Sequence, residues 1–229
     1  YFLLFGGFGI LPVVETLKWG GLMLTLIIAG VGIIISFPIG ILLALGRQSE
    51  LSTVRFFSVL YIEFIRAVPL ITILFMASNV LPLFFDAGIS MDKLVRALIA
   101  ITLFQAAYMA EVVRGGLQAI PKGQYEAADA IGLSYYQKNI LIVLPQALKI
   151  SIPNIVGSSI SLFKDTTLVL IIGLMDFLTV VSFATADSAW LGRHLEGYIF
   201  VAMVLWIMLY TMSRYSKKLE LRFNTENIN

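Results

Sequence analysis

Pairs of opposite charges interrupt the apolar stretches of this sequence, and their spacing suits the binding of a polar solute. Glu63 precedes Arg66 by three residues and Glu111 precedes Arg114 by three, so each pair shares one helix face. A charged side chain at the centre of a bilayer costs roughly 2.5–3.5 kcal/mol and generally faces a cavity or a partner. The pairs are therefore either internal ion pairs or the lining of a cavity for a solute carrying both an ammonium and a carboxylate.

Lys164 and Asp165 form a third group of charges within an apolar stretch. Adjacent residues lie about 100° apart around a helix, so these two side chains cannot share one face. At least one of them should point into the helix bundle. Upstream in the same stretch, Pro153-Asn154 is expected to interrupt the helix, either as a packing kink or to expose backbone groups to a cavity.

The composition excludes several other kinds of chemistry. Hydrophobic residues make up 59% of the chain, charged residues 13%, and the mean hydropathy is +0.92, so lipid is the expected solvent. The net charge of +2, without a basic run, argues against nucleic acid. The absence of cysteine excludes disulfides and thiolate metal sites, and no other metal site is expected. No Gly-x-x-x-x-Gly-Lys-Ser/Thr motif occurs, so the chain cannot bind ATP through a phosphate loop.

The apolar stretches predict an all-α membrane protein, because a spanning helix needs about 20 apolar residues. About five spans are expected, at residues 19–45, 56–83, 91–115, 147–175 and 196–212. Together they define a transmembrane domain, 19–213, between an N-terminal extracytoplasmic segment, 1–18, and a cytoplasmic tail, 214–229. The chain starts at Tyr1 instead of Met, which is compatible with a signal peptide or further helices upstream.

Basic residues predict the direction of the spans. Nine of them fall on one side of the expected bundle, namely Arg47, Arg55, Arg114, Lys122, Lys138, Arg214, Lys217, Lys218 and Arg222. The loops on the other side carry both signs of charge. Short loops rich in Lys and Arg stay in the cytoplasm, so the N-terminus is expected outside and the C-terminus inside.

A mostly polar loop at residues 120–140 then faces the cytoplasm. Pro121 suits the start of a short helix and Gly132 its end. Ser134 and Gln137 fit a capping box that begins a second helix leading back to the membrane. One interpretation is an amphipathic helix resting on lipid headgroups, but its apolar face is mostly alanine. The other is a surface that another protein approaches closely.

The loop resembles a known motif. Glu126-Ala127-Ala128, three residues, Gly132, nine residues and Ile142-x-Leu144-Pro145 is similar to the EAA loop of ABC importer permeases. Three further stretches resemble the polar amino acid permeases of that family, namely 61–70, 107–116 and 161–168. Within the first, Ala67-Val68 replaces the family's Gly-Thr, which puts the substrate range in doubt. Weaker likenesses at 19–22, 196–198 and 213–215 favour the general L-amino-acid branch.

The resemblance implies a type I importer permease fold and a multi-pass subunit of the bacterial inner membrane. It implies that this chain is not an enzyme and holds no cofactor, and that ATP and Mg are bound by a partner ATPase. The implied partners are a second homologous permease, preferably in a heterodimer, two ATPase subunits and an extracytoplasmic substrate-binding protein. The residues expected to couple to the ATPase are Gly123, Glu126, Ala127, Ala128 and Gly132. The residues expected along the substrate pathway are Glu63, Arg66, Gln105, Tyr108, Lys164, Asp165 and Thr166.

Two other classes of protein compete with this interpretation. A secondary transporter or channel driven by an ion gradient would also hold charges within its spans, but such proteins often contain internal repeats, and no convincing duplication is found. A membrane scaffold without transport would leave the buried Glu, Arg, Lys and Asp residues unexplained. The expected function is therefore that of half a translocation pathway in an ATP-driven amino acid importer.

Overall fold

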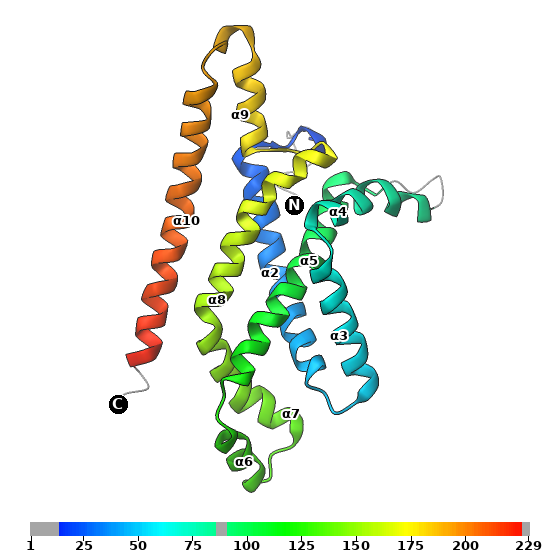
Figure 1. Ribbon diagram of the computed structural model, residues 1–229, viewed down its shortest axis with the longest axis vertical. Helices are drawn as coiled ribbons and strands as arrows, with labels where there is room; N and C mark the ends of the chain where they lie inside the picture. The colour runs from blue at the N-terminus through cyan, green and yellow to red at the C-terminus, as the bar shows by residue number, and fades with distance from the viewer. Residues whose placement is uncertain (1–13, 86–90, 226–229) are drawn as a thin grey trace, which may run out of the picture. The chain divides into compact units, whose positions relative to one another are not determined.

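The chain is helical almost throughout, as expected from its apolar stretches. The computed structural model describes residues 14–85 and 91–225 (Figure 1). Four of the described helices are long and apolar enough to cross a membrane, or five if one bent pair of helices is a single span. The predicted all-α membrane fold is confirmed.

The helices follow one another with short connections. The longer ones are α2 (Gly21–Arg47), α3 (Ser52–Ala67), α5 (Lys93–Gln118), α8 (Leu144–Asp165), α9 (Phe177–Ala186) and α10 (His194–Thr225). The shorter α-helices are α4 (Leu70–Phe75), α6 (Lys122–Ala130) and α7 (Tyr135–Gln137). Turns of 3-10 helix occupy Thr16–Lys18, Leu81–Phe84, Thr166–Ile172 and Ser188–Trp190, and turns of π-helix occupy Met76–Val80 and Lys138–Val143. The two-residue strand β1 (Met175–Asp176) bridges in parallel to Gly20 and Gly21.

The second predicted span is broken instead of straight. Helix α3 ends at Ala67, and the helical segment from Leu70 to Phe84 continues at an angle of 100° to it. Pro69 lacks a backbone N–H, and its ring disfavours helical dihedrals at the preceding residue, Val68. The prediction of one continuous helix over residues 56–83 was therefore wrong at this corner.

A complete break at Pro153-Asn154, one of the two outcomes expected there, is not found, and a packing kink within the helix stays a prediction. Helix α8 runs through Pro153 without a break. Proline is tolerated inside membrane helices, where neighbouring groups can satisfy the carbonyl that it leaves unpaired. Helix α8 ends further along the chain, at Asp165, and the chain continues as a 3-10 helix from Thr166.

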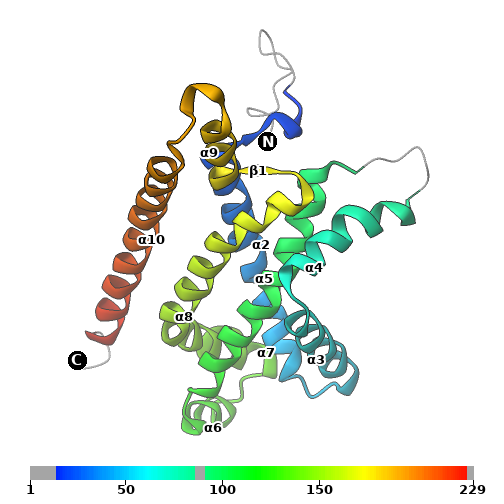
Figure 2. The same cartoon turned by 45° about the horizontal axis from the view of Figure 1, so that its top comes forward.

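Helices α9 and α10 form a hairpin that the apolar pattern did not predict (Figure 2). Asp176 caps the start of α9, accepting hydrogen bonds from the backbone N–H groups of Leu178 and Thr179 at 3.2 and 3.3 Å. The backbone N–H of Phe177 donates to Thr25 Oγ1 in α2 at 3.0 Å. With only ten residues, α9 is too short to cross a bilayer on its own.

The contacts of the chain divide it into two compact units, each with its own core. The first contains the described residues up to 34 together with 68–104 and 162–207. Its fully buried side chains include Leu24, Ile28, Leu94, Ile101 and Leu162. The second contains 35–67, 105–161 and the residues from 208 onward, and holds the charged residues and the loop described below.

Small residues bring the helices of the second unit close together. Its apolar cluster consists of Ala44, Ile62, Ala110, Val113, Leu117, Ile120, Val143 and Ala147. Gly116 of α5 lies against α8, where an added Cβ would overlap Ser151 Oγ and the carbonyl oxygen of Ala147. Close backbone approach through small residues is typical of membrane helices, whose association gains little from the hydrophobic effect.

Candidate functional site

The polar loop forms one short helix with a defined end. Helix α6 begins after Pro121 and ends in a turn at Gly132, which has φ +75°. The N–H of Leu133 donates to the carbonyl of Ala128 at 3.2 Å, and the N–H of Gly132 donates to that of Asp129 at 3.0 Å. This bond pair is a Schellman motif, in which glycine is favoured at the left-handed position. The predicted helix and its glycine end are confirmed.

The return to the membrane begins at the predicted capping box. Ser134 accepts a hydrogen bond from the backbone of Gln137 at 3.4 Å, and the Gln137 side chain accepts one from the backbone of Ser134 at 3.0 Å. Lys138 Nζ lies 2.6 Å from Asp129 Oδ1, so an ion pair ties the returning turn to α6. Figure 1 shows α6 at the bottom of the view, below the lower ends of α5 and α8.

Tyr125 anchors the inner side of α6. Its hydroxyl donates to the carbonyl of Leu117 at 3.3 Å. Burial raises the pKa of the Tyr125 phenol, an effect that the nearby charge of Lys138 partly opposes. The phenol therefore stays neutral and keeps its donor at physiological pH.

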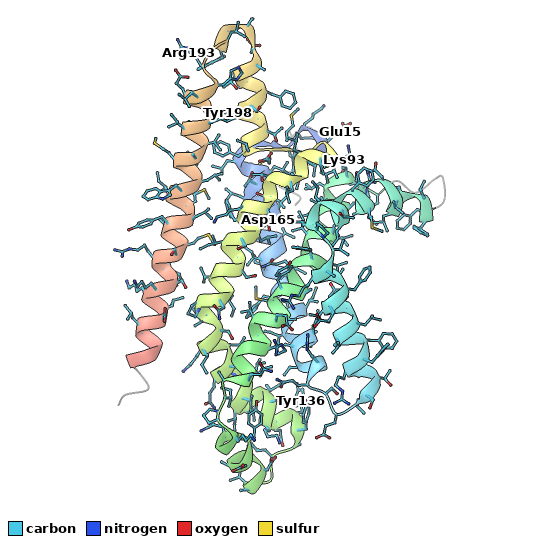
Figure 3. All side chains as sticks on the ribbon, in the orientation of Figure 1. Glu15, Lys93, Tyr136, Asp165, Arg193 and Tyr198 are labelled. Carbon is cyan, nitrogen blue, oxygen red and sulfur yellow. The ribbon has the colours of Figure 1, made fainter. Side chains whose placement is uncertain are left out.

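The outer side of the loop exposes a small, partly apolar surface. Four of the five residues predicted to couple to a partner, Gly123, Glu126, Ala127 and Gly132, are exposed. The fifth, Ala128, is completely buried and so supports the helix from within. The large exposed side chains of this surface are Ile131, Tyr135, Tyr136 and Leu141, with Ile131 and Tyr136 each 72% exposed. Figure 3 marks Tyr136 in this loop.

Five charged side chains meet in the second unit. The Glu111 carboxylate lies 2.8 Å from Arg47 Nη1, 2.8 Å from Arg114 Nη2 and 3.5 Å from Arg66 Nη1. Arg47 also lies 2.9 Å from Glu63. Three guanidinium groups against two carboxylates leave this charge cluster with a net charge of +1.

The charge cluster differs from the two separate pairs that the spacing suggested. The pair between Glu111 and Arg114 is present, with Arg114 Nε also donating to the carboxylate at 3.0 and 3.1 Å. Glu63 and Arg66, however, each find an ion-pair partner on another helix. Arg47 joins helices α2, α3 and α5, a role that sequence reasoning missed because it assigned this residue to a cytoplasmic loop. Its only signal in the sequence was its position at the last turn of a long apolar stretch.

Arg66 and Tyr108, two of the predicted pathway residues, lie in contact with each other. The guanidinium carbon lies 5.7 Å from the centre of the Tyr108 ring, within the range of a cation–π interaction. Gln105, one turn away on α5, is buried and donates to Ser158 Oγ at 2.9 Å. Its amide is thus bonded to α8.

The remaining predicted pathway residues lie where α8 changes into a 3-10 helix. Lys164 is exposed and Asp165 is half-buried, in agreement with their expected separation around the helix. Thr166 is fully buried and donates to the carbonyl of Phe163 at 2.8 Å. Figure 3 marks Asp165 at this junction.

The fold is that of the membrane subunit of a type I ABC importer. A solved structure described as an amino acid ABC transporter with histidines superposes with a TM-score of 0.77 and 28% identity, over 88% of this chain and 92% of that chain. The MetNI methionine ABC transporter superposes with a TM-score of 0.64, over 86% of this chain and 91% of that chain, at 18% identity, a likeness of fold alone.

Residues 36–224 match the family of the binding-protein-dependent transport system inner membrane component, and the chain belongs to this family. It is 60% identical over 225 residues to the inner membrane amino-acid ABC transporter permease protein YhdY of Escherichia coli K12. It is 53% identical over 218 residues to the glutamate/glutamine/aspartate/asparagine transport system permease protein BztC of Rhodobacter capsulatus. These alignments cover 98% and 95% of this chain, but the chain spans only 61% and 50% of the lengths of these two relatives.

A relative of similar length is the probable glutamine ABC transporter permease protein GlnP of Bacillus subtilis. It is 34% identical over 89% of this chain and 92% of its own length. The family is one of inner membrane transport components, so the interpretation as an ABC permease is supported over that of an ion-driven secondary transporter. Within the described residues, no group of three or more His, Asp or Glu side chains could hold a metal ion.

Proposed function

We propose that this chain is a permease subunit of an ATP-driven amino acid importer and supplies half of its translocation pathway. Support comes from the family match over residues 36–224 and from relatives whose names specify amino acid transport. In this proposal the chain performs no catalysis. ATP and Mg bind to separate ATPase subunits, and the energy of hydrolysis reaches the permease through a contact between proteins.

That contact is the outer surface of the loop formed by α6 and α7. Its exposed residues combine a negative charge at Glu126, small side chains at Ala127 and Gly132, and apolar groups at Ile131 and Tyr136. Large exposed apolar groups on an otherwise polar loop favour a protein partner. The Schellman motif at the end of α6 and the ion pair between Lys138 and Asp129 hold α6 against the turn that leads into α8. A movement of α6 would therefore be transmitted to α8.

The charged residues predicted for the solute pathway differ in how accessible their side chains are. Glu63 is 54% exposed, whereas the Glu111 carboxylate, held by three arginines, is 15% exposed. In this proposal the exposed Glu63 and the half-buried Asp165 face the ammonium or a cationic side chain of the amino acid. Arg66 receives the carboxylate, with Lys164 as the weaker candidate. Gln105, Tyr108 and Thr166 are the further residues that we propose for the pathway.

The assembly follows from the incomplete enclosure of this pathway. Only 6% of the most apolar stretch of helix α10 is buried within the chain, so lipid or another subunit must cover this stretch. A second, homologous permease closes the pathway, two ATPase subunits lie beneath the two loops, and an external binding protein delivers the solute. A heterodimer of permeases is favoured. The N-terminal end of the transmembrane domain lies outside and the C-terminal tail in the cytoplasm, as the basic residues predict.

The test is reconstitution in liposomes of the permease purified together with its ATPase and binding protein. ATP inside the liposomes should drive uptake of a labelled amino acid, and omission of the ATPase should abolish it. Uptake that persists without the ATPase and follows an imposed ion gradient would instead identify a secondary transporter. Mass spectrometry of the same preparation would identify the second permease.

A further inference from the structure

The C-terminal turns of α10, drawn in red in Figure 1, carry a basic face that neither the coupling loop nor the solute pathway uses. With 3.6 residues per turn, residues spaced by three and four fall on one side of a helix. Arg214, Lys217, Lys218 and Leu221 follow this spacing, and all four are exposed. Positive charge is therefore gathered on one side of the helix.

The same side of α10 is apolar further up the helix. Met203, Ile207 and Tyr210 continue the series towards the N-terminus and are all exposed. Two buried residues of α10, Val201 at 2% exposure and Ser216 at 8%, lie on the opposite side of the helix by the same periodicity. The residues of this face, apolar towards the N-terminus of α10 and basic towards its C-terminus, are thus exposed, whereas the opposite side of the helix contains its buried residues.

This order of side chains matches a lipid leaflet. An apolar helix face borders the acyl chains, and the basic residues that follow it reach the level of the headgroups. Arg214 lies at the transition, with its guanidinium carbon 5.8 Å from the centre of the Tyr210 ring. Tyrosine and tryptophan are enriched at this level of a membrane, and Trp206 and Tyr215 are also exposed near it.

The basic turns also border a shallow hollow of about 580 Å³. It is lined by Thr211, Arg214, Tyr215, Lys217, Lys218 and Leu221. The hollow combines three cations and two hydroxyl groups with the apolar side chain of Leu221. The three cations and the hydroxyl of Tyr215 suit the oxygens of a phosphate group, whereas Thr211 already donates to the carbonyl of Met208 at 2.7 Å. Leu221 suits the glycerol and upper acyl region.

We infer that the basic face of α10 formed by Arg214, Lys217 and Lys218 is a binding site for the headgroups of anionic phospholipids. An acidic surface of a partner subunit is the competing occupant. The continuity of the basic residues with the exposed apolar side chains of Met203 and Ile207 favours lipid, because a single leaflet accounts for both parts of the face. The inference needs only the family's membrane location and does not depend on the carried solute.

Native mass spectrometry of the purified permease, titrated with phosphatidylglycerol or phosphatidylcholine, measures this binding. The unaltered protein should prefer phosphatidylglycerol. Each basic residue near an anionic surface contributes about 1 kcal/mol, so Arg214→Gln with Lys217→Gln should weaken phosphatidylglycerol binding at least about tenfold. The control, Lys18→Gln with Arg193→Gln, removes two exposed positive charges that are expected on the opposite side of the bundle and should leave the affinity unchanged. Equal affinities in the two double variants, or no preference for phosphatidylglycerol, would overturn the inference.

A second measurement identifies the occupant directly. A photo-crosslinking amino acid at position 221, within the intact transporter in native membranes, should attach to phospholipid. A crosslink to an ATPase or to another permease subunit would instead show a protein interface and overturn the lipid site. This readout stays decisive even if the double variant is poorly expressed.

Discussion

Arg47 at the end of α2 places a guanidinium nitrogen 2.8 Å from the carboxylate of Glu111 in α5, across 64 residues of sequence. This ion pair connects α2 to α5. Arg47 also holds Glu63 of α3, and Glu111 also holds Arg114 and lies near Arg66. The charge cluster therefore joins α2, α3 and α5 through ion pairs.

Glu111→Gln should destabilise the protein more than any other single neutralisation in the charge cluster. It removes the carboxylate that faces three guanidinium groups and leaves them with Glu63 alone. Breaking a buried pair typically costs 3–5 kcal/mol, and because the arginines are partly exposed we expect about 2 kcal/mol here. A lower thermal unfolding midpoint of the purified protein, followed by size-exclusion chromatography after heating, would show it.

Glu63→Gln provides the matched control for this substitution. Glu63 is more than half exposed and pairs with one arginine, so its loss should cost less than about 1 kcal/mol. If both glutamine variants unfolded at the same temperature as the unaltered protein, the charge cluster would have no structural role.

Gly116→Ala should loosen the contact between α5 and α8. The added methyl group would overlap Ser151 Oγ and the carbonyl oxygen of Ala147, and overpacking of this kind typically costs about 1–3 kcal/mol. The neighbouring Gly115 has open space around it, so Gly115→Ala should be neutral or gain up to about 1 kcal/mol of helix propensity. Comparable unfolding midpoints for the two alanine variants would contradict the packing seen at Gly116.

The long helices of this fold could be predicted from composition, but their bends could not. An apolar run shows that a segment enters lipid, whereas the 100° corner after α3 depends on two residues, Val68 and Pro69. The restriction that proline places on the preceding residue was present in the sequence and was outweighed by the length of the apolar run. Pro153 is the opposite case, because the same residue type lies within a continuous α8. Hydropathy does not distinguish these two prolines.

The loop could be predicted in detail because its signals are local. Gly132 ends α6, and Ser134 with Gln137 begins the return helix, all through hydrogen bonds between residues close in sequence. The charge cluster could not be predicted, since its partners are brought together by packing between helices. Spacing on one helix paired Glu63 with Arg66, whereas the fold pairs Glu63 with Arg47.

Gly132→Pro and Glu126→Lys should each uncouple transport from ATP hydrolysis under the proposed function. Proline fixes φ near −65°, which is incompatible with the φ of +75° at residue 132, so the turn that ends α6 would be lost. Glu126→Lys reverses an exposed charge on the outer surface of α6. We expect uptake in proteoliposomes to fall at least tenfold, while ATP hydrolysis by the same preparation continues.

Gly30→Ala serves as the control for these loop variants. Gly30 lies in α2, has open space around it, and should accept a methyl group without loss of uptake. Normal ATP-driven uptake in both Gly132→Pro and Glu126→Lys would rule out coupling through this loop.

Asp165→Asn and Glu63→Gln should each depress amino acid uptake if these carboxylates face the solute. An ammonium group pairs with a carboxylate more strongly than with a neutral amide, because charge-assisted hydrogen bonds are roughly twice as strong as neutral ones. The expected signature is a raised KM for uptake, by about tenfold for each variant, with normal amounts of assembled transporter in the membrane. Lys164→Gln should have the smaller effect, because the adjacent Asp165 offsets the charge of Lys164 and Arg66 is the first candidate for the carboxylate. Unchanged KM values in both carboxylate variants would place the solute pathway elsewhere in this subunit or in the second permease.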